Sequence, residues 1–170
     1  VGSEMCIRDS VSFKDVTEDI CCLGLFGPKS REMISKISND DFSNDKFKFG
    51  TGKFIMINGV KVWAQRLSYV GELGFELYVD SSLAKDLYEI LIEEGKNFEL
   101  SHCGMHAMDI MRMESGFVHW GHDISPEENQ YQAGLKFAIS YKKNVNFIGK
   151  DALLKIKDQK SDKRLSLIHI

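Results

Sequence analysis

The 170-residue sequence has little proline, little cysteine and no long apolar run. With only two prolines and a hydrophobic fraction of 43%, it does not have the composition of a disordered chain. No stretch reaches the roughly 18 uninterrupted apolar residues that a membrane-spanning helix needs, so we expect no membrane partner. The 22 basic residues are spread among 25 acidic ones, for a net charge of −3, so we expect no nucleic-acid partner either.

The cysteines are few and do not suggest disulfides. Two of the four, Cys21 and Cys22, are adjacent, which is not the pattern of a disulfide framework. No charged and apolar leader resembles a secretory signal. The sequence therefore predicts a reducing, cytoplasmic location.

The two ends of the chain are interpreted as a translated DNA tag. When Leu165–Ile170 is back-translated, its reverse complement encodes Met5–Asp9. This resembles the end sequence of a transposase-based sequencing adapter. Residues 1–9 and 165–170 are therefore left out of the fold prediction. The rest is expected to be an internal fragment of a longer protein.

Strands and helices are predicted in mixed order. Hydrophobic alternation and turn signals such as Asn58-Gly59 indicate the strands, and apolar residues at helical spacing indicate the helices. Strands are expected at residues 19–26, 54–57, 60–64, 75–79 and 135–141, and helices at residues 28–37, 83–95, 105–115 and 151–157. Because strand and helix do not alternate strictly, the expected class is α+β, with mixed antiparallel sheets and packed helices.

A cluster of histidines raises the question of a metal site. His102, Cys103 and His106 lie close to His119 and His122 in the sequence. Their spacing is not that of a structural zinc site, and no paired Cys-x-x-Cys sets are present. Ordinary hydrogen-bonded histidines are the simpler interpretation, so no metal is expected.

Two glutamates, Glu72 and Glu76, flank a turn bounded by glycines. A carboxylate that projects from a strand can accept two parallel hydrogen bonds from an amidine-like edge, such as that of a pterin or guanine ring. A solvent-facing glutamate on the polar side of a half-buried strand would give the same pattern. The residues alone leave both interpretations open.

Three segments in the order LGLFGPKSR (23–31), YVGELGFELYV (69–79) and CGMHAMDIMRMESG (103–116) resemble the folate-binding aminomethyltransferase family, which includes the glycine-cleavage T-protein. The later segments Phe117–Ile124 and Phe147–Leu153 are more similar to the folate domains of dimethylglycine and sarcosine dehydrogenases. The resemblance implies a truncated folate-binding domain. Residues 10–141 would be its C-terminal portion, and residues 142–164 the start of the family's C-terminal barrel.

The resemblance also implies site residues. It assigns pterin binding to Glu76, a supporting contact to Tyr69, and positions near the folate to Phe117 and Trp120. Met108 stands where the family usually has an arginine that helps to hold folate, and dehydrogenase-type members commonly lack that arginine too. The catalytic aspartate of the family lies upstream of residue 18, so no catalytic residue is expected here.

The function implied by the resemblance is one-carbon transfer to tetrahydrofolate. FAD on a missing N-terminal flavin domain of the same protein would oxidise an N-methyl amine such as dimethylglycine or sarcosine. The folate would then capture the carbon as 5,10-methylenetetrahydrofolate. The fragment alone is expected to be inactive. A glycine-cleavage T-protein and a non-catalytic folate-binding module remain the alternatives.

Overall fold

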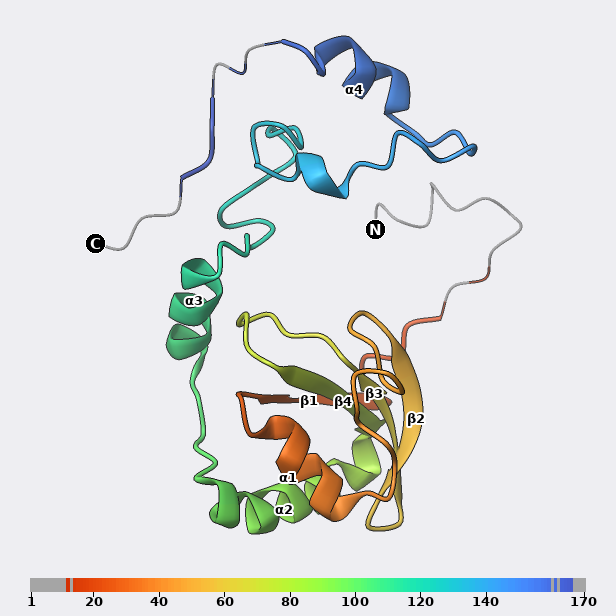
Figure 1. Cartoon of the computed structure of the whole chain (residues 1–170), viewed down its shortest axis with the longest axis vertical. Coiled ribbons are helices and arrows are strands. Elements are labelled where there is room, and N and C mark those ends of the chain that lie inside the picture. Colours follow the sequence, from red (N-terminus) through yellow and green to blue (C-terminus); the bar gives the residue numbers. More distant parts are fainter. Residues whose placement is uncertain (1–11, 13, 160, 162, 167–170) are drawn as a thin grey trace. The chain divides into compact units, whose positions relative to one another are not determined.

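The computed structural model describes residues 12, 14–159, 161 and 163–166. The chain divides into two compact units, of which the first ends at Gly104 and the second begins at Met105 (Figure 1). Apart from residues 165 and 166, the predicted terminal tags lie outside the described residues. The domain boundary expected after residue 141 stays a prediction.

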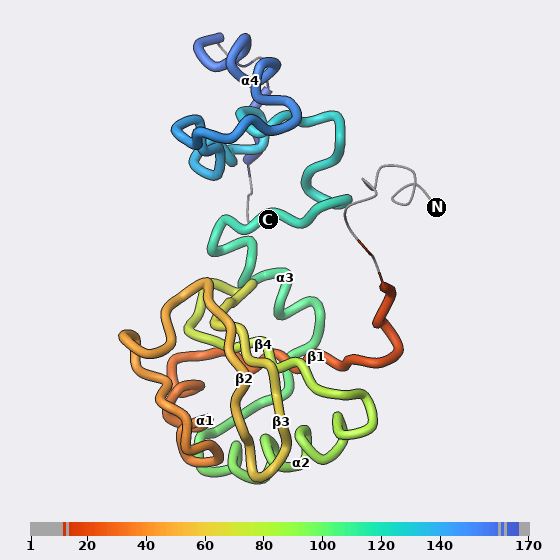
Figure 2. Tube along the Cα trace, turned by 90° about the vertical axis from the view of Figure 1, so that its right-hand side faces the viewer, coloured from red at the N-terminus to blue at the C-terminus, as the bar shows by residue number. Residues whose placement is uncertain are grey.

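The first unit contains a four-stranded antiparallel sheet (Figures 1 and 2). The strand order is β1-β4-β3-β2, so β4 lies between β1 and β3. The four strands are β1 (Ile20–Phe26), β2 (Gly52–Ile57), β3 (Val60–Gln65) and β4 (Gly74–Asp80). All four overlap strands that the sequence predicts.

Two helices, α1 (Ser30–Ile37) and α2 (Ala84–Gly95), cover one face of this sheet (Figure 1). Short 3-10 turns, η2 (Ser81–Leu83) and η3 (Lys96–Phe98), flank α2. The core lies between the helices and the sheet because alternate strand residues point toward the helices. Its buried side chains are Leu25, Met33, Ile34, Ile37, Phe42, Phe47, Ile55, Ile57, Val62, Ala64, Phe75, Leu77, Val79, Leu87 and Leu91.

The turn between β1 and α1 is held against the segment before β4. Gly27 has a φ of +126°, a conformation that glycine adopts without a steric penalty. Its N–H donates to the carbonyl of Leu73 at 2.7 Å, and Ser30 Oγ donates to the same carbonyl at 3.2 Å. These bonds fix the entry to β4, the strand that carries Glu76.

The second unit contains α3 (Met105–Glu114), a 3-10 turn η4 (Lys136–Ala138) and α4 (Lys150–Ile156). The strand predicted at residues 135–141 is wrong, because η4 occupies its centre. Ala138 N–H donates to the carbonyl of Leu135 at 3.0 Å, so this backbone is bonded locally. Within the described part of the second unit, the segment has no strand beside it with which to pair.

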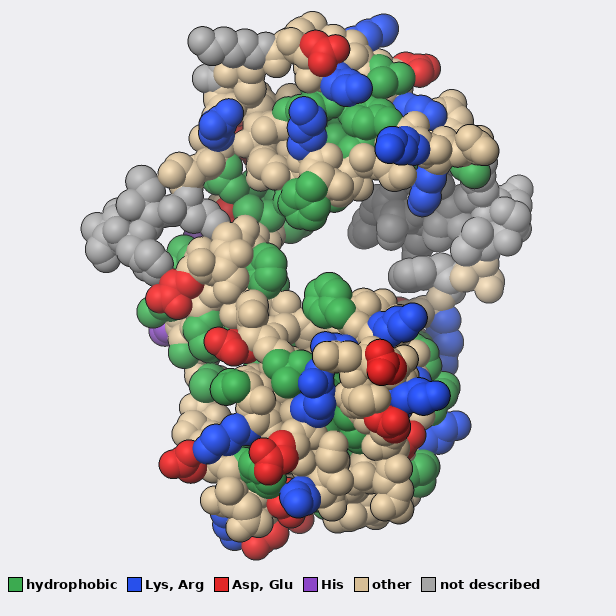
Figure 3. All heavy atoms as spheres, viewed as in Figure 1, with side chains coloured by type: hydrophobic (Ala, Val, Ile, Leu, Met, Phe, Trp, Pro, Cys, Tyr) green, Lys and Arg blue, Asp and Glu red, His purple; other side chains and the backbone are tan. Residues whose placement is uncertain are grey.

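Charged side chains of both signs are interspersed on the surface visible in Figure 3, as the small net charge leads one to expect. No described helix is long and apolar enough to cross a membrane.

Candidate functional site

The face of the sheet that points away from α1 and α2 carries the candidate site. Glu76 lies in the middle of β4, opposite Gly24 on β1 and Gln65 on β3. Tyr78, two residues further along β4, points to the same face. Both side chains are half-buried, whereas Phe75 and Leu77 between and beside them are buried in the core. The sequence-predicted strand therefore places Glu76 on the open face.

Tyr78 holds the Glu76 carboxylate. Its hydroxyl donates to Glu76 Oε2 at 2.7 Å. This hydrogen bond, together with partial burial, raises the pKa of Tyr78 well above its ordinary value, because the carboxylate stabilises the protonated phenol. A carboxylate has about four lone-pair positions, so Glu76 keeps further acceptor capacity after binding Tyr78.

Two aromatic rings lie close against glycines on this face. The ring of Phe26 lies over Gly24 and Gly74, since a Cβ added at these glycines would stand 2.6 Å and 2.3 Å from it. The ring of Trp63 lies over Gly52 in the same way, at 2.6 Å. The sequence analysis missed Phe26. No sequence signal marks it, because its pairing with Gly74 depends on the register of β1 against β4.

The thiol of Cys22 completes the surroundings of Glu76. Cys22 on β1 is opposite Tyr78 in the sheet register. Partial burial and the negative charge of Glu76 raise the pKa of the Cys22 thiol. The thiol is therefore mostly protonated near neutral pH, and thiols react mainly as thiolates.

Replacing Glu76 with glutamine is expected to make Cys22 more reactive. Losing the neighbouring negative charge lowers the pKa of the thiol, so at pH 7.5 the alkylation rate rises roughly twofold or more. The rate of iodoacetamide labelling can be followed by mass spectrometry of the Cys22 peptide in a Cys21→Ser background. Glu72→Gln, an exposed change in the turn before β4, is the control. Equal rates in both variants would contradict the proximity of Cys22 and Glu76.

The other predicted site residues lie on loops. Tyr69 is half-buried in the segment between β3 and β4, in the same unit as Glu76. Phe117 and Trp120 belong to the second unit, in the loop after α3, and are 39% and 65% exposed. Met108 is half-buried on α3 itself. The structure thus brings Glu76 and Tyr69 into one unit and Phe117 and Trp120 into the other.

Three of the four histidines that raised the metal question have other partners. His102 Nε2 lies 2.7 Å from the Tyr88 hydroxyl, and the rings of His119 and His122 are stacked with their centroids 5.7 Å apart. Among the residues that the structure describes, no group of three or more His, Cys, Asp or Glu side chains is arranged to hold a metal ion.

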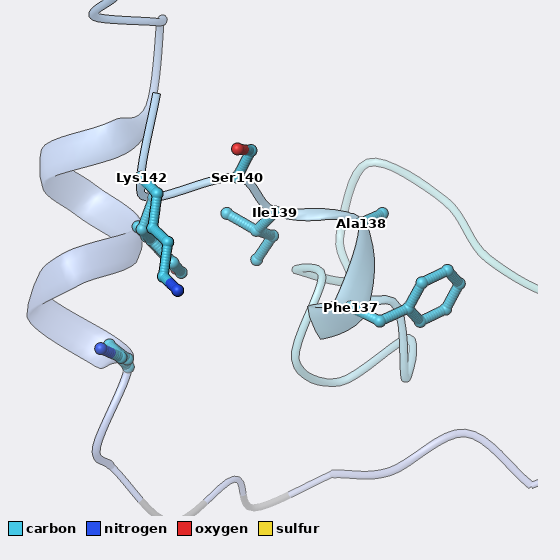
Figure 4. A pocket seen from close by; sticks show the side chains of 7 residues that line it. Phe137, Ala138, Ile139, Ser140 and Lys142 are labelled. Carbon is cyan, nitrogen blue, oxygen red and sulfur yellow. The ribbon is translucent and has the colours of Figure 1, made fainter. Parts of the chain in front are cut away.

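A surface hollow of about 470 Å³ lies in the second unit (Figure 4). Residues 137–142 and Lys157 line it, and Lys157 Nζ lies 5.4 Å from the centre of the Tyr141 ring. None of the four predicted site residues is in this lining, so the hollow is separate from the candidate site.

Residues 3–143 match the model of the GCVT N-terminal domain family, and the chain belongs to this family. The predicted resemblance to aminomethyltransferases is thereby confirmed. The fold prediction is supported by a solved structure, the glycine cleavage system aminomethyltransferase T from Bartonella henselae. That match has a TM-score of 0.67 and 24% identity, and it covers 81% of this chain and 36% of the other. The α+β class is confirmed.

Two curated relatives are more similar in sequence. The chain is 42% identical over 150 residues to 4-methylaminobutanoate oxidase (formaldehyde-forming) from Paenarthrobacter nicotinovorans, covering 88% of this chain and 18% of that protein. It is 35% identical over 155 residues to human mitochondrial dimethylglycine dehydrogenase, covering 91% and 18%. The chain therefore spans less than a fifth of the length of either relative.

Proposed function

We propose that this chain is the folate-binding part of an enzyme that removes a one-carbon unit from an N-methyl amine. Membership of the GCVT N-terminal domain family supports a role in one-carbon transfer. The names of the two curated relatives describe oxidation of 4-methylaminobutanoate and of dimethylglycine, which are both short N-methylated amino acids. Dimethylglycine or sarcosine is the substrate that we propose.

The observation that carries the proposal is the placement of Glu76. Its carboxylate stands on the open face of the sheet, opposite a glycine and held by Tyr78 at 2.7 Å. The N–H and NH₂ groups on one edge of a pterin ring are matched donors for such a carboxylate. The Glu76 oxygen acceptors that remain after the Tyr78 bond, and the aromatic ring of Phe26 close to Gly24, fit a planar group with a donor edge.

The other candidate residues take supporting roles in this proposal. Tyr69 supports the pterin contact from the loop before β4. Phe117 and Trp120 offer aromatic surface to a planar ligand, since both are exposed in the second unit. Tetrahydrofolate, when bound, supplies the amines that accept the one-carbon unit. The residues of this chain bind and orient it, which lowers the entropic cost of the transfer.

Oxidation of the amine needs an electron acceptor. We assign this step to FAD on a flavin domain of the same protein, outside these 170 residues. A second candidate is release of the carbon as formaldehyde without folate, and the name of the Paenarthrobacter relative favours it. The two candidates differ in whether this chain binds a reduced folate.

Folinic acid should bind to the chain, and Glu76→Gln should weaken its affinity at least tenfold. The amide keeps the size of the side chain but loses the charge, and hydrogen bonds to a charged group contribute about 1.5–3 kcal/mol. Isothermal titration calorimetry measures the change. Glu72→Gln, which alters the exposed glutamate of the preceding turn, should leave the affinity unchanged.

Each result distinguishes the candidates. No binding by the unsubstituted chain, with the circular dichroism of a folded protein, would favour formaldehyde release. Binding that Glu76→Gln leaves unchanged would place the pterin elsewhere on the chain.

A further inference from the structure

A buried ion pair links α3 to the loop that follows it. Arg112 on α3 is 1% exposed, and the side chain of Asp123 is 8% exposed. Arg112 Nη1 donates to Asp123 Oδ2, and Nη2 lies 3.4 Å from Oδ1. Nη1 also donates to the carbonyl of Phe117 at 3.2 Å, and Nε donates to Asp109 at 3.1 Å. One guanidinium therefore contacts both ends of the loop.

Asp123 in turn holds the middle of the loop. Its Oδ2 accepts the N–H of His119 at 2.8 Å, and its Oδ1 lies 3.1 Å from His122 Nδ1. Burial alone would raise the pKa of Asp123, but the hydrogen bonds from Arg112, His119 and His122 outweigh it and lower that pKa to about 2. Asp123 is therefore an anion at neutral pH.

The backbone of this loop also forms internal hydrogen bonds. Phe117 N–H donates to the carbonyl of Arg112 at 2.8 Å, and Asp123 N–H donates to the carbonyl of His119 at 2.9 Å. Trp120 forms an isolated parallel bridge with Ile124. Trp120, which is 65% exposed, thus projects from a backbone that is held by several hydrogen bonds.

A gain in fold stability alone does not explain the buried Arg112–Asp123 pair. Removing two charges from water is costly, so a buried ion pair often stabilises a fold no more than apolar residues would. A bidentate arginine pair does fix geometry, because its donors have a rigid planar arrangement. An exposed indole on a loop that is fixed in this way presents its apolar ring surface in one orientation.

We propose that Arg112 and Asp123 are positioning residues that hold Trp120 in place as a contact surface for a planar ligand. The inference rests on the proposed function, since tetrahydrofolate is that ligand. Neither residue is proposed to touch the folate. Their effect passes through the loop backbone and through the orientation of the indole.

The test uses the 170-residue chain with Trp63→Phe, so that Trp120 is its single tryptophan. Asp123→Asn removes the charge and keeps the shape of the side chain. We expect the fluorescence anisotropy of Trp120 to fall without ligand, and the affinity for folinic acid to fall about tenfold. Asp109→Asn alters the outer, 38%-exposed partner of Arg112 and should change the affinity less than twofold. Asp123→Glu, which restores the charge, should recover part of both signals.

Two readouts separate failure of this inference from failure of the proposed function. Unchanged anisotropy in Asp123→Asn would overturn the positioning role, and this measurement needs no ligand. Lower anisotropy with unchanged folinic-acid affinity would overturn the role of Trp120 as a contact surface. If the parent chain binds no folinic acid, the proposed function fails, and with it the ligand assigned to Trp120. Circular dichroism of each variant shows whether it is folded at the temperature used.

Discussion

Replacing Phe75 with alanine is expected to lower the free energy of unfolding of the first unit by about 3–5 kcal/mol, as for other large buried aromatic side chains. Phe75 is fully buried on the helix-facing side of β4, next to Glu76. Its ring centroid lies 5.6 Å from those of both Phe42 and Phe47. The substitution would leave a cavity at the centre of this three-ring cluster, which packs the segment before β2 against the sheet.

The loss can be measured by urea unfolding with Trp63 as the reporter, in a Trp120→Phe background. Phe49→Ala is the matched control because Phe49 is 73% exposed, and a surface change of this kind should alter the stability by no more than about 0.5 kcal/mol. A loss below about 1 kcal/mol for Phe75→Ala would show that the three rings do not form the core that the structure describes.

The sheet was largely predictable from local patterns. Strict alternation in β4 predicts that Phe75 and Leu77 face the core and that Glu76 and Tyr78 face outward, and the structure confirms this. The Asn58-Gly59 signal predicts the hairpin of β2 and β3, and both residues have positive φ. These features depend on neighbouring residues only, so no knowledge of distant contacts is needed.

The parts that the sequence did not predict depend on distant contacts. Phe42 lies in a stretch that is polar on both sides, yet it is only 2% exposed because it packs against Phe47 and against Phe75 of β4. The apolar run at 135–141 suggested a strand. A strand needs a neighbouring strand for its backbone hydrogen bonds, but here the backbone forms the local hydrogen bonds of η4 instead. Tertiary context overrode local preference in both places.

The candidate site also combines features that local sequence patterns predict with features that depend on distant contacts. The position of Glu76 on an exposed face follows from the alternation of β4. Its neighbours Gly24 and Cys22 come from β1, and only the strand register brings them beside it. The pairing of Arg112 with Asp123 is also invisible in the sequence, where each is one charged residue among many.

Replacing Asp123 with alanine is expected to lower the free energy of unfolding of the second unit by about 3 kcal/mol at pH 7, because it leaves the buried Arg112 guanidinium without its main partner. Asp109, which is 38% exposed, compensates only part of that charge. Urea unfolding followed by Trp120 fluorescence, in a Trp63→Phe background, measures the loss. Asp109→Asn is the control and should cost less than about 1 kcal/mol.

The difference in unfolding free energy between the parent chain and Asp123→Ala should depend on pH. The pKa of Asp123 is lowered from 3.8 to about 2 in the folded chain, so the unfolded chain binds a proton more readily than the folded one. The stability that Asp123 contributes is therefore fully present above pH 4 and is lost as the pH falls from about 4 to about 2. The difference between the parent and Asp123→Ala should shrink by roughly 2 kcal/mol over this window. A difference that stays constant from pH 5 to pH 2 would mean that the carboxylate of Asp123 is not held by Arg112 and the loop N–H groups in solution.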